Sequence, residues 1–474
     1  METLKVLSTA FLSILFLLSS YTFAQTKKPL PQRWNAELAI VGGTIVSMDK
    51  DRRIIEDGAI VIEKGKIVKI GKRVDVMKNL RPKQIINATG KVIIPGLINT
   101  HTHVPMTLFR GIADDLDLNE WLTKYIFPAE GKNVTEDFVR VGTQLGLAEF
   151  IRGGTTTFCD MYYFEDAIAD ETSKAGMRAV LGETLIDFPV PDNKTFADAK
   201  VYTEKFVKKW QKSSLIVPAV APHAPYTVSE DHLKEARKLA DDLNAPMVIH
   251  LAEDRKELKF VADNKNGLRP IEYLNKIGVL NDKTIAAHVI YANDEELDIM
   301  KKLGVGIAHN PQSNMKLAAG VAPIPQMLER DMDVGLGTDG AASNNDLSLW
   351  EEMDSAAKLH KVFNFDPKVL SAQQAFEMAT IRGARALDLQ EKIGSLETGK
   401  QADIVIVDFD GLHQTPFYNM YSHLVYATKS TDVRTVVVDG KILMLDRKLL
   451  TINETLIKQK ANKYRDQVVR SLAN

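Results

Sequence analysis

The chain has 474 residues, of which 45% are hydrophobic and 26% are charged, a composition typical of a folded globular protein and not of a disordered one. Its 60 basic and 62 acidic residues give a net charge of −2, so there is no basic excess to neutralise phosphates, which argues against nucleic-acid binding as the main function. The single cysteine, Cys159, excludes an intramolecular disulfide and a zinc site built from several cysteines.

Residues 1–24 predict a secretory signal peptide. Lys5 precedes an apolar run over residues 10–18, and the small residue Ala24 stands at a plausible cleavage point. The apolar run is shorter than the roughly 20 residues that span a bilayer, which disfavours the alternative, a membrane anchor. We therefore expect an exported protein, periplasmic or secreted, with no membrane attachment once the signal is removed.

Short segments rich in Ile and Val, separated by turns, occur near both ends of the chain, within residues 36–95 and 391–450. We expect these two regions to form one small β-sandwich domain, and two unrelated β modules are the alternative. Residues 451–474 predict an exposed amphipathic helix.

Between residues 96 and 390 apolar strands alternate with helices, as in the helix that Ser229 can cap. Eight candidate strands lead to a polar or ionisable residue: His101, Asp160, Glu183, His223, His250, His288, His309 and Asp339. An α/β fold of the (β/α)8 TIM-barrel type gives this pattern, because its active site gathers at the carboxyl ends of the strands.

Four of these strand-end positions have the side chains of a metal site. His101 and His103 stand two residues apart, so their side chains point the same way and can share one cation. With His250 and Asp339 they supply three imidazole nitrogens and a carboxylate oxygen, which suit one divalent metal, zinc first and iron as the alternative. Each residue alone is more often structural, but four in barrel order are hard to explain by chance.

Two further residues suggest hydrolysis at this site. Glu253 lies three residues after His250, and His288 closes the next strand. A metal lowers the pKa of bound water from 15.7 toward about 7, but bases must still move the proton to the substrate. We expect Glu253 to protonate a ring nitrogen, with His288 and Asp339 handling the hydroxide. On position alone, a solvated loop charge is an equal alternative for Glu253.

Longer motifs around these residues resemble those of the amidohydrolase superfamily. They are HTHVPMTLFRG after PGLIN, HLAED, AAHVIY, AHNPQSNMKL and GTDGAASNN. The last of these, together with the HAPY that begins at His223, resembles the 5-methylthioadenosine/S-adenosylhomocysteine deaminases in particular. The resemblance covers about residues 38–445 and implies a barrel with a β-sandwich made from both termini.

The resemblance also implies roles for single residues. The implied metal ligands are His101, His103, His250 and Asp339. Barrels with two metals carry a carboxylated lysine where this chain has PHAPY, which implies a single metal and frees His223 to contact the substrate. Trp121 would line a nucleoside pocket and Glu130 would bind the ribose hydroxyls. A core aromatic and a helix-surface charge are the structural alternatives for these two residues.

The reaction implied is hydrolytic deamination of an adenine nucleoside (methylthioadenosine, S-adenosylhomocysteine or adenosine), which gives the inosine analogue and ammonia. Hydroxide would attack C6 of the purine, with Glu253 as general acid/base. A small molecule is thus the expected partner, and the sequence leaves open whether the chain forms a homo-oligomer. The alternatives are a deaminase or chlorohydrolase of another amino-heterocycle (guanine-like, pyrimidine or s-triazine) and a catalytically inactive barrel, which the complete ligand set disfavours.

One position departs from the family pattern. Relatives that accept S-adenosylhomocysteine place an arginine shortly after a Gly-Met-Arg segment, to bind the amino-acid carboxylate. Here Gly176-Met177-Arg178 is followed by Glu183 at about that position. We expect Glu183 to repel such a carboxylate.

Overall fold

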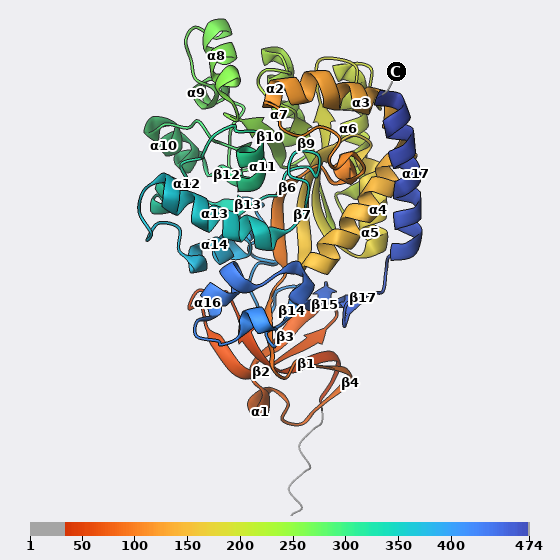
Figure 1. Cartoon of the computed structure of the whole chain (residues 1–474), viewed down its shortest axis with the longest axis vertical. Helices are drawn as coiled ribbons and strands as arrows, with labels where there is room; N and C mark the ends of the chain where they lie inside the picture. Colours follow the sequence, from red (N-terminus) through yellow and green to blue (C-terminus); the bar gives the residue numbers. More distant parts are fainter. Residues whose placement is uncertain (1–33, 473–474) are drawn as a thin grey trace, which may run out of the picture.

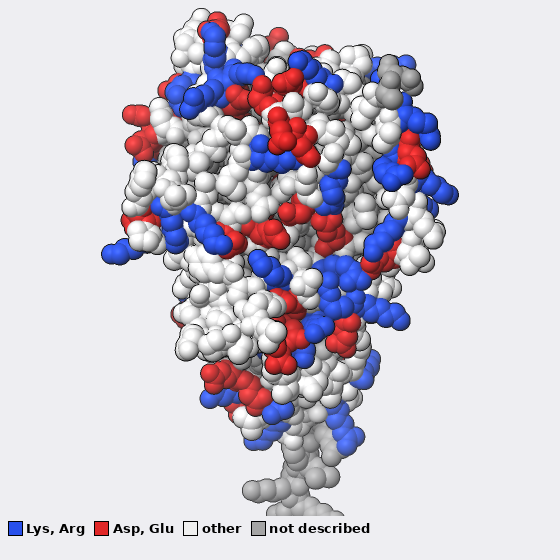
Figure 2. Space-filling model, viewed as in Figure 1, with Lys and Arg blue, Asp and Glu red and all other residues white. Residues whose placement is uncertain are grey.

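The computed structural model describes residues 34–472, and Figure 1 shows a helix-covered barrel above a smaller β domain. Lys and Arg side chains are interspersed with Asp and Glu over the face seen in Figure 2, in keeping with the net charge of −2.

Eight parallel strands close into a barrel in the order β10-β11-β12-β13-β6-β7-β8-β9. The strands are β6 (Leu97–Thr102), β7 (Thr155–Tyr162), β8 (Arg178–Leu185), β9 (Ile216–Pro222), β10 (Met247–Leu251), β11 (Thr284–His288), β12 (Gly306–His309) and β13 (Val334–Leu336). They coincide with the eight apolar segments of the sequence, because strands covered by helices on one side and packed on the other read as nearly continuous apolar runs. The predicted (β/α)8 barrel is therefore confirmed.

Helices and helical turns cover the barrel and connect its strands. They are η1 (Val104–Phe109), α2 (Leu118–Glu120), η2 (Trp121–Ile126), α3 (Phe127–Asn133), α4 (Glu136–Gly153), α5 (Glu165–Ala175), α6 (Phe196–Trp210), α7 (Glu230–Asp242), α8 (Arg255–Asn264), α9 (Pro270–Lys276), α10 (Asp294–Leu303), α11 (Pro311–Lys316), α12 (Ile324–Glu329), α13 (Leu349–Phe363), α14 (Ala372–Met378) and α15 (Ile381–Ala386). In α4, the Thr135 side chain accepts a hydrogen bond from Phe138 N at the first turn, and Gly154 ends the helix at φ 85°.

The small domain is a nine-stranded sheet made from both ends of the chain, which confirms a β domain built from the two termini. Its order is β17-β16-β15-β14-β5-β1-β2-β3, with β4 paired to β1. The strands are β1 (Trp34–Val46), β2 (Ile54–Glu63), β3 (Lys66–Lys72), β4 (Leu80–Asn87), β5 (Lys91–Pro95), β14 (Ile404–Asp408), β15 (Val433–Val438), β16 (Lys441–Leu445) and β17 (Lys448–Leu449). The short helical elements in these regions are α1 (Arg73–Val76), η3 (Leu412–Gln414), α16 (Met420–Ser422), η4 (His423–Ala427) and η5 (Ser430–Asp432).

The chain passes directly from this domain into the barrel at Gly96, between β5 and β6. A Cβ atom at Gly96 would lie 2.0 Å from Thr156 Oγ1, so only glycine fits this close approach to β7. The last helix, α17 (Glu454–Leu472), lies along α4 (Figure 1) and buries Ile457 and Val468.

A buried ion pair connects the two domains. Arg178 Nε, at the start of β8, lies 3.0 Å from Asp403 Oδ2 beside β14, and both side chains are at most 3% exposed. We expect Arg178→Leu to lower the free energy of unfolding by about 3–5 kcal/mol, because Asp403 would stay buried without its partner charge. Urea unfolding measures this loss. The double variant R178L/D403L should recover most of it, and no recovery would contradict the assignment.

The prediction of a signal peptide and of export is wrong on the present findings. The prediction rested on residues 1–24, which lie outside the described part of the chain. No apolar helix of the described part supports a signal peptide. Within residues 34–472, none of the helices combines the length and the apolar character that crossing a membrane requires.

Candidate metal and substrate site

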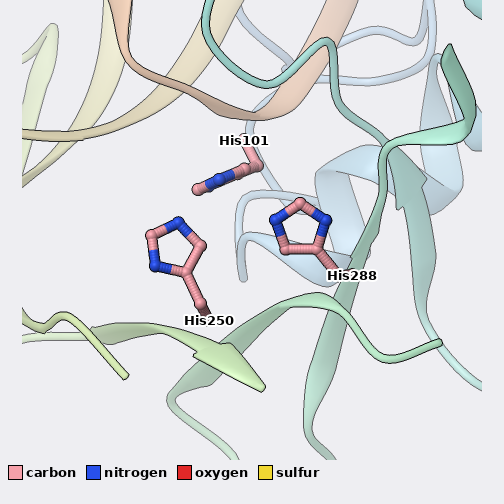
Figure 3. A group of neighbouring side chains, drawn as sticks. All are labelled: His101, His250 and His288. Carbon is pink, nitrogen blue, oxygen red and sulfur yellow. The ribbon is translucent and has the colours of Figure 1, made fainter. Parts of the chain in front are cut away.

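The predicted metal-binding side chains meet at the carboxyl end of the barrel, although they come from distant parts of the sequence. His101 closes β6, His250 lies in β10 and His288 ends β11, and their rings face one another in Figure 3. The ring centre of His101 lies 4.8 Å from that of His103 and 4.9 Å from that of His250.

Backbone carbonyls fix two of these imidazoles in one orientation. His250 Nδ1 donates to the carbonyl oxygen of His223 at 2.9 Å, and His103 Nδ1 donates to that of Met161. In both rings this hydrogen bond places the proton on Nδ1 and leaves the lone pair of Nε2 free. Metal-binding histidines are usually held by a hydrogen bond of this kind from their other ring nitrogen.

Asp339 completes the cluster from the loop after β13. Its Oδ1 lies 3.2 Å from His103 Nε2 and 3.5 Å from His101 Nε2. Its Oδ2 accepts hydrogen bonds from Ser313 Oγ at 2.7 Å and Ser343 Oγ at 2.8 Å. Asp339 has a φ of 58°, a strained conformation for a non-glycine residue of the kind that clusters at functional sites.

The donor atoms fit a divalent cation. Neither ring nitrogen of the fully buried His101 has a hydrogen-bond partner among residues 34–472. Burial lowers the pKa of His101 to about 4, so its imidazole is neutral and can donate a lone pair near pH 7. Two sets of donor atoms lie within 4.8 Å of one another: His101 with His103 and Asp339, and His101 with His250 and His288.

Glu253 and His288 lie side by side at the edge of this cluster. His288 Nε2 is 3.5 Å from Glu253 Oε1, and His288 Nδ1 is 2.9 Å from Asn314 Oδ1. Glu253 is 6% exposed, and burial raises the pKa of its carboxyl. The structure therefore excludes a solvated loop charge and places a carboxyl group that holds a proton more readily next to an imidazole.

Glu257 holds this loop in place, and the sequence reasoning missed it. Its carboxylate accepts hydrogen bonds from Glu253 N at 2.7 Å and from Ala252 N at 3.0 Å. A buried carboxylate that binds two consecutive backbone amides fixes the direction of the Glu253 side chain. The only signal in the sequence was a second glutamate four residues after Glu253 in the first turn of α8.

A pocket with a cavity volume of about 50 Å³ lies over the cluster. Trp121, Glu130 and His223 all line it, together with the predicted His103, His250, Glu253 and Asp339. The sequence reasoning missed the other lining residues, Met106, Leu118, Leu122, Ile126, Phe127, Met161, Tyr162, Tyr163, Thr184 and Tyr226. A cavity of about 350 Å³ adjoins the pocket and shares Leu118, Leu122 and Tyr226 with it.

Glu130 is a buried carboxyl of this pocket, at 4% exposure, and not a helix-surface charge. Burial raises its pKa to about 7, against the weaker opposing effect of the Tyr162 hydroxyl. The folded state thus favours the protonated form. The higher pKa of Glu130 in the folded state stabilises that state. This stabilisation is fully present below pH 4.5 and is lost as the pH rises through 7.

We therefore expect Glu130→Gln to become more stable than the parent protein with rising pH, by on the order of 2 kcal/mol above pH 8. The neutral amide keeps the shape of the side chain and avoids the buried charge. Thermal unfolding at pH 4.5 and pH 8.5 in the same metal state measures the difference. An equal difference at both pH values would contradict the shifted pKa of Glu130.

Glu183 does not face the pocket, contrary to expectation. Its side chain is fully buried, where Oε2 accepts from Glu165 N at 3.0 Å and Oε1 from Asn193 Nδ2 at 3.1 Å. Successive strand residues point to opposite sides, and it is the next residue of β8, Thr184, that lines the pocket. Glu183 is therefore a structural group behind the pocket wall.

Comparisons with known proteins identify the family of this chain. The amidohydrolase family model matches residues 92–443. A 5-methylthioadenosine/S-adenosylhomocysteine deaminase from Syntrophobacter fumaroxidans is 46% identical over 88% of this chain and 95% of its own length. A 5'-deoxyadenosine deaminase from Methanocaldococcus jannaschii is 46% identical over 85% of this chain and 94% of its own.

Among solved structures, an adenosine deaminase from Xanthomonas campestris with bound zinc has a TM-score of 0.91 and 35% identity, and covers 93% of this chain and 100% of its own. The resemblance read from the motifs is thus confirmed, and the histidine–aspartate cluster is a divalent-metal site. The chain belongs to the amidohydrolase family.

Proposed function

We propose that this chain is a hydrolytic deaminase of adenine nucleosides, which replaces the 6-amino group of the purine with oxygen and releases ammonia. The observation that carries this function is the pairing of Glu253 with His288 at 3.5 Å beside the metal cluster, with Glu253 in the lining of a pocket over that cluster. The names of the relatives agree with it, since they describe deaminases of methylthioadenosine, S-adenosylhomocysteine and 5'-deoxyadenosine.

We assign one metal ion to His101, His103, His250 and Asp339, with zinc as the proposed metal. Three imidazoles and one carboxylate suit zinc, and the structural neighbour described above holds zinc. When bound there, the metal would lower the pKa of a water molecule, which would make a nucleophile available near pH 7.

Glu253, His288 and Asp339 move the protons of the reaction. Glu253 gives its proton to the ring nitrogen N1 while the oxygen of water adds to C6. Asp339 and His288 take the proton that this water loses and return it to the amino group, which leaves as ammonia. The remaining hydroxyl proton restores Glu253, so every group returns to its starting state.

The pocket residues position the nucleoside. Glu130 would accept hydrogen bonds from the ribose hydroxyls, and His223, with Nδ1 held by Thr227 Oγ1 at 2.9 Å, presents Nε2 to the substrate. Trp121 would cover the nucleoside, and its buried Nε1 has no hydrogen-bond partner among residues 34–472. A polar atom left unpaired in a closed pocket is suited to a ligand that supplies the missing acceptor.

Ammonia release from zinc-loaded protein tests the function. The substrates are adenosine, methylthioadenosine, S-adenosylhomocysteine, guanine, cytosine and an aminotriazine. Turnover of adenine nucleosides supports the proposal, with Glu130→Gln as a variant that should raise KM for nucleosides. Activity confined to the rings without a sugar would overturn it and remove the assigned roles of Glu130 and Trp121.

A further inference from the structure

The described residues that line the pocket include no lysine and no arginine. Its ionisable side chains are three carboxyl groups, those of Glu130, Glu253 and Asp339, together with histidines and tyrosines. Apart from the metal, a negatively charged substituent in this pocket would find no lysine or arginine among these lining residues to pair with.

The adjoining cavity does not supply that charge either. It is lined by Lys256, but also by Asp254 and Glu257. Lys256 Nζ already lies 2.8 Å from Asp117 Oδ1, in an ion pair between the first turn of α8 and the start of α2. A carboxylate would have to compete with Asp117 for this lysine while facing two further acidic residues.

The wall behind β7 and β8 is acidic as well. Asp160, Glu165, Glu183 and Asp192 lie there, and none of them forms an ion pair within residues 34–472. The loop after β8 carries Asp187, which lies 2.6 Å from His232 Nδ1, and an exposed Lys194. Apart from the exposed Lys194, this side of the pocket therefore offers a carboxylate no cationic partner among these residues.

We propose that the pocket selects adenine nucleosides whose 5' substituent is uncharged, such as 5'-deoxyadenosine and methylthioadenosine, and rejects S-adenosylhomocysteine because of its amino-acid carboxylate. This inference rests on the proposed function and makes it narrower. It also distinguishes between the activities that the names of the two relatives describe. One name includes S-adenosylhomocysteine and the other does not, while both relatives are 46% identical to this chain.

The test compares kcat/KM for four nucleosides: methylthioadenosine, 5'-deoxyadenosine, 5'-butylthioadenosine and S-adenosylhomocysteine. The butylthio compound is close to S-adenosylhomocysteine in length but carries no charge, so it separates charge from size. We expect it to react within about tenfold of methylthioadenosine, and S-adenosylhomocysteine to react at least about 100-fold more slowly.

Three results would go against the proposal in different ways. Comparable turnover of S-adenosylhomocysteine and the butylthio compound overturns the inference but leaves the proposed function intact. If Lys256→Ala then lost the turnover of S-adenosylhomocysteine, the carboxylate would be located in the adjoining cavity. Rejection of both compounds means selection by size and also overturns it. Ammonia from none of the nucleosides overturns the proposed function itself.

A charge introduced at the pocket edge provides a second measurement. Phe188 is 37% exposed, and its ring centre lies 5.4 Å from that of the lining residue Phe127. We expect Phe188→Arg to raise the ratio of S-adenosylhomocysteine to methylthioadenosine turnover by about tenfold over Phe188→Met, the uncharged control. Equal turnover ratios in the two variants would contradict the proposal that S-adenosylhomocysteine is rejected because the pocket lacks a positive charge.

Discussion

Replacing Glu253 with Gln is expected to lower kcat for methylthioadenosine by about 10³-fold while the metal content stays unchanged. The amide has the size of the carboxyl but cannot pass a proton to the purine nitrogen. Glu253 lies beside His288 and is not part of either set of metal-donor atoms, so the metal should remain. Ammonia release gives the rate, and elemental analysis gives the metal content.

Asp254→Asn is the matched control for this variant. Asp254 is the neighbouring acidic residue, and its side chain caps α8 by accepting from Lys256 N, which asparagine can also do. We expect nearly full activity from this control. Loss of metal in Glu253→Gln would show that Glu253 is a ligand and would remove it from the role of general acid.

His101→Ala is expected to release the metal and abolish turnover, whereas His288→Ala should lose activity and keep the metal. His101 belongs to both sets of donor atoms, and each of its nitrogens lacks another partner among residues 34–472. His288, in contrast, is placed by Asn314 and faces Glu253. The two histidines are a matched pair, since both are buried and both lie at the carboxyl ends of barrel strands, β6 and β11.

Metal content and the melting temperature with and without chelator distinguish these outcomes. A metal that binds only the folded state stabilises it, so a chelator should lower the melting temperature of the parent protein and of His288→Ala. It should have little effect on His101→Ala. Full metal retention in His101→Ala would overturn the ligand assignment, and metal loss in His288→Ala would move His288 into the ligand set.

The sequence was informative where local geometry alone decides the outcome. Apolar strands that end in His101, His250 and Asp339 could be recognised because a barrel brings the ends of its strands together in a fixed order. The prediction of export failed because an apolar run near the N-terminus gave a compositional signal that no described part of the molecule supports.

Other features depended on packing between segments far apart in the chain. The sequence suggested Glu183 as a substrate-facing residue, but the alternation of β8 turns it away and gives that position to Thr184. Glu257 and Tyr226 were missed because their importance lies in what they contact across the site.

The sequence by itself thus determined the fold class and the family and suggested the residues proposed as metal ligands, since strand periodicity and short motifs specify which side chains stand at the end of each strand. Only the tertiary structure decided which carboxyl groups line the pocket and that no lysine or arginine is among the described residues that line it. The physical reason is that burial and charge environment are properties of a side chain's neighbours in space, and those neighbours come from loops whose packing no local pattern specifies.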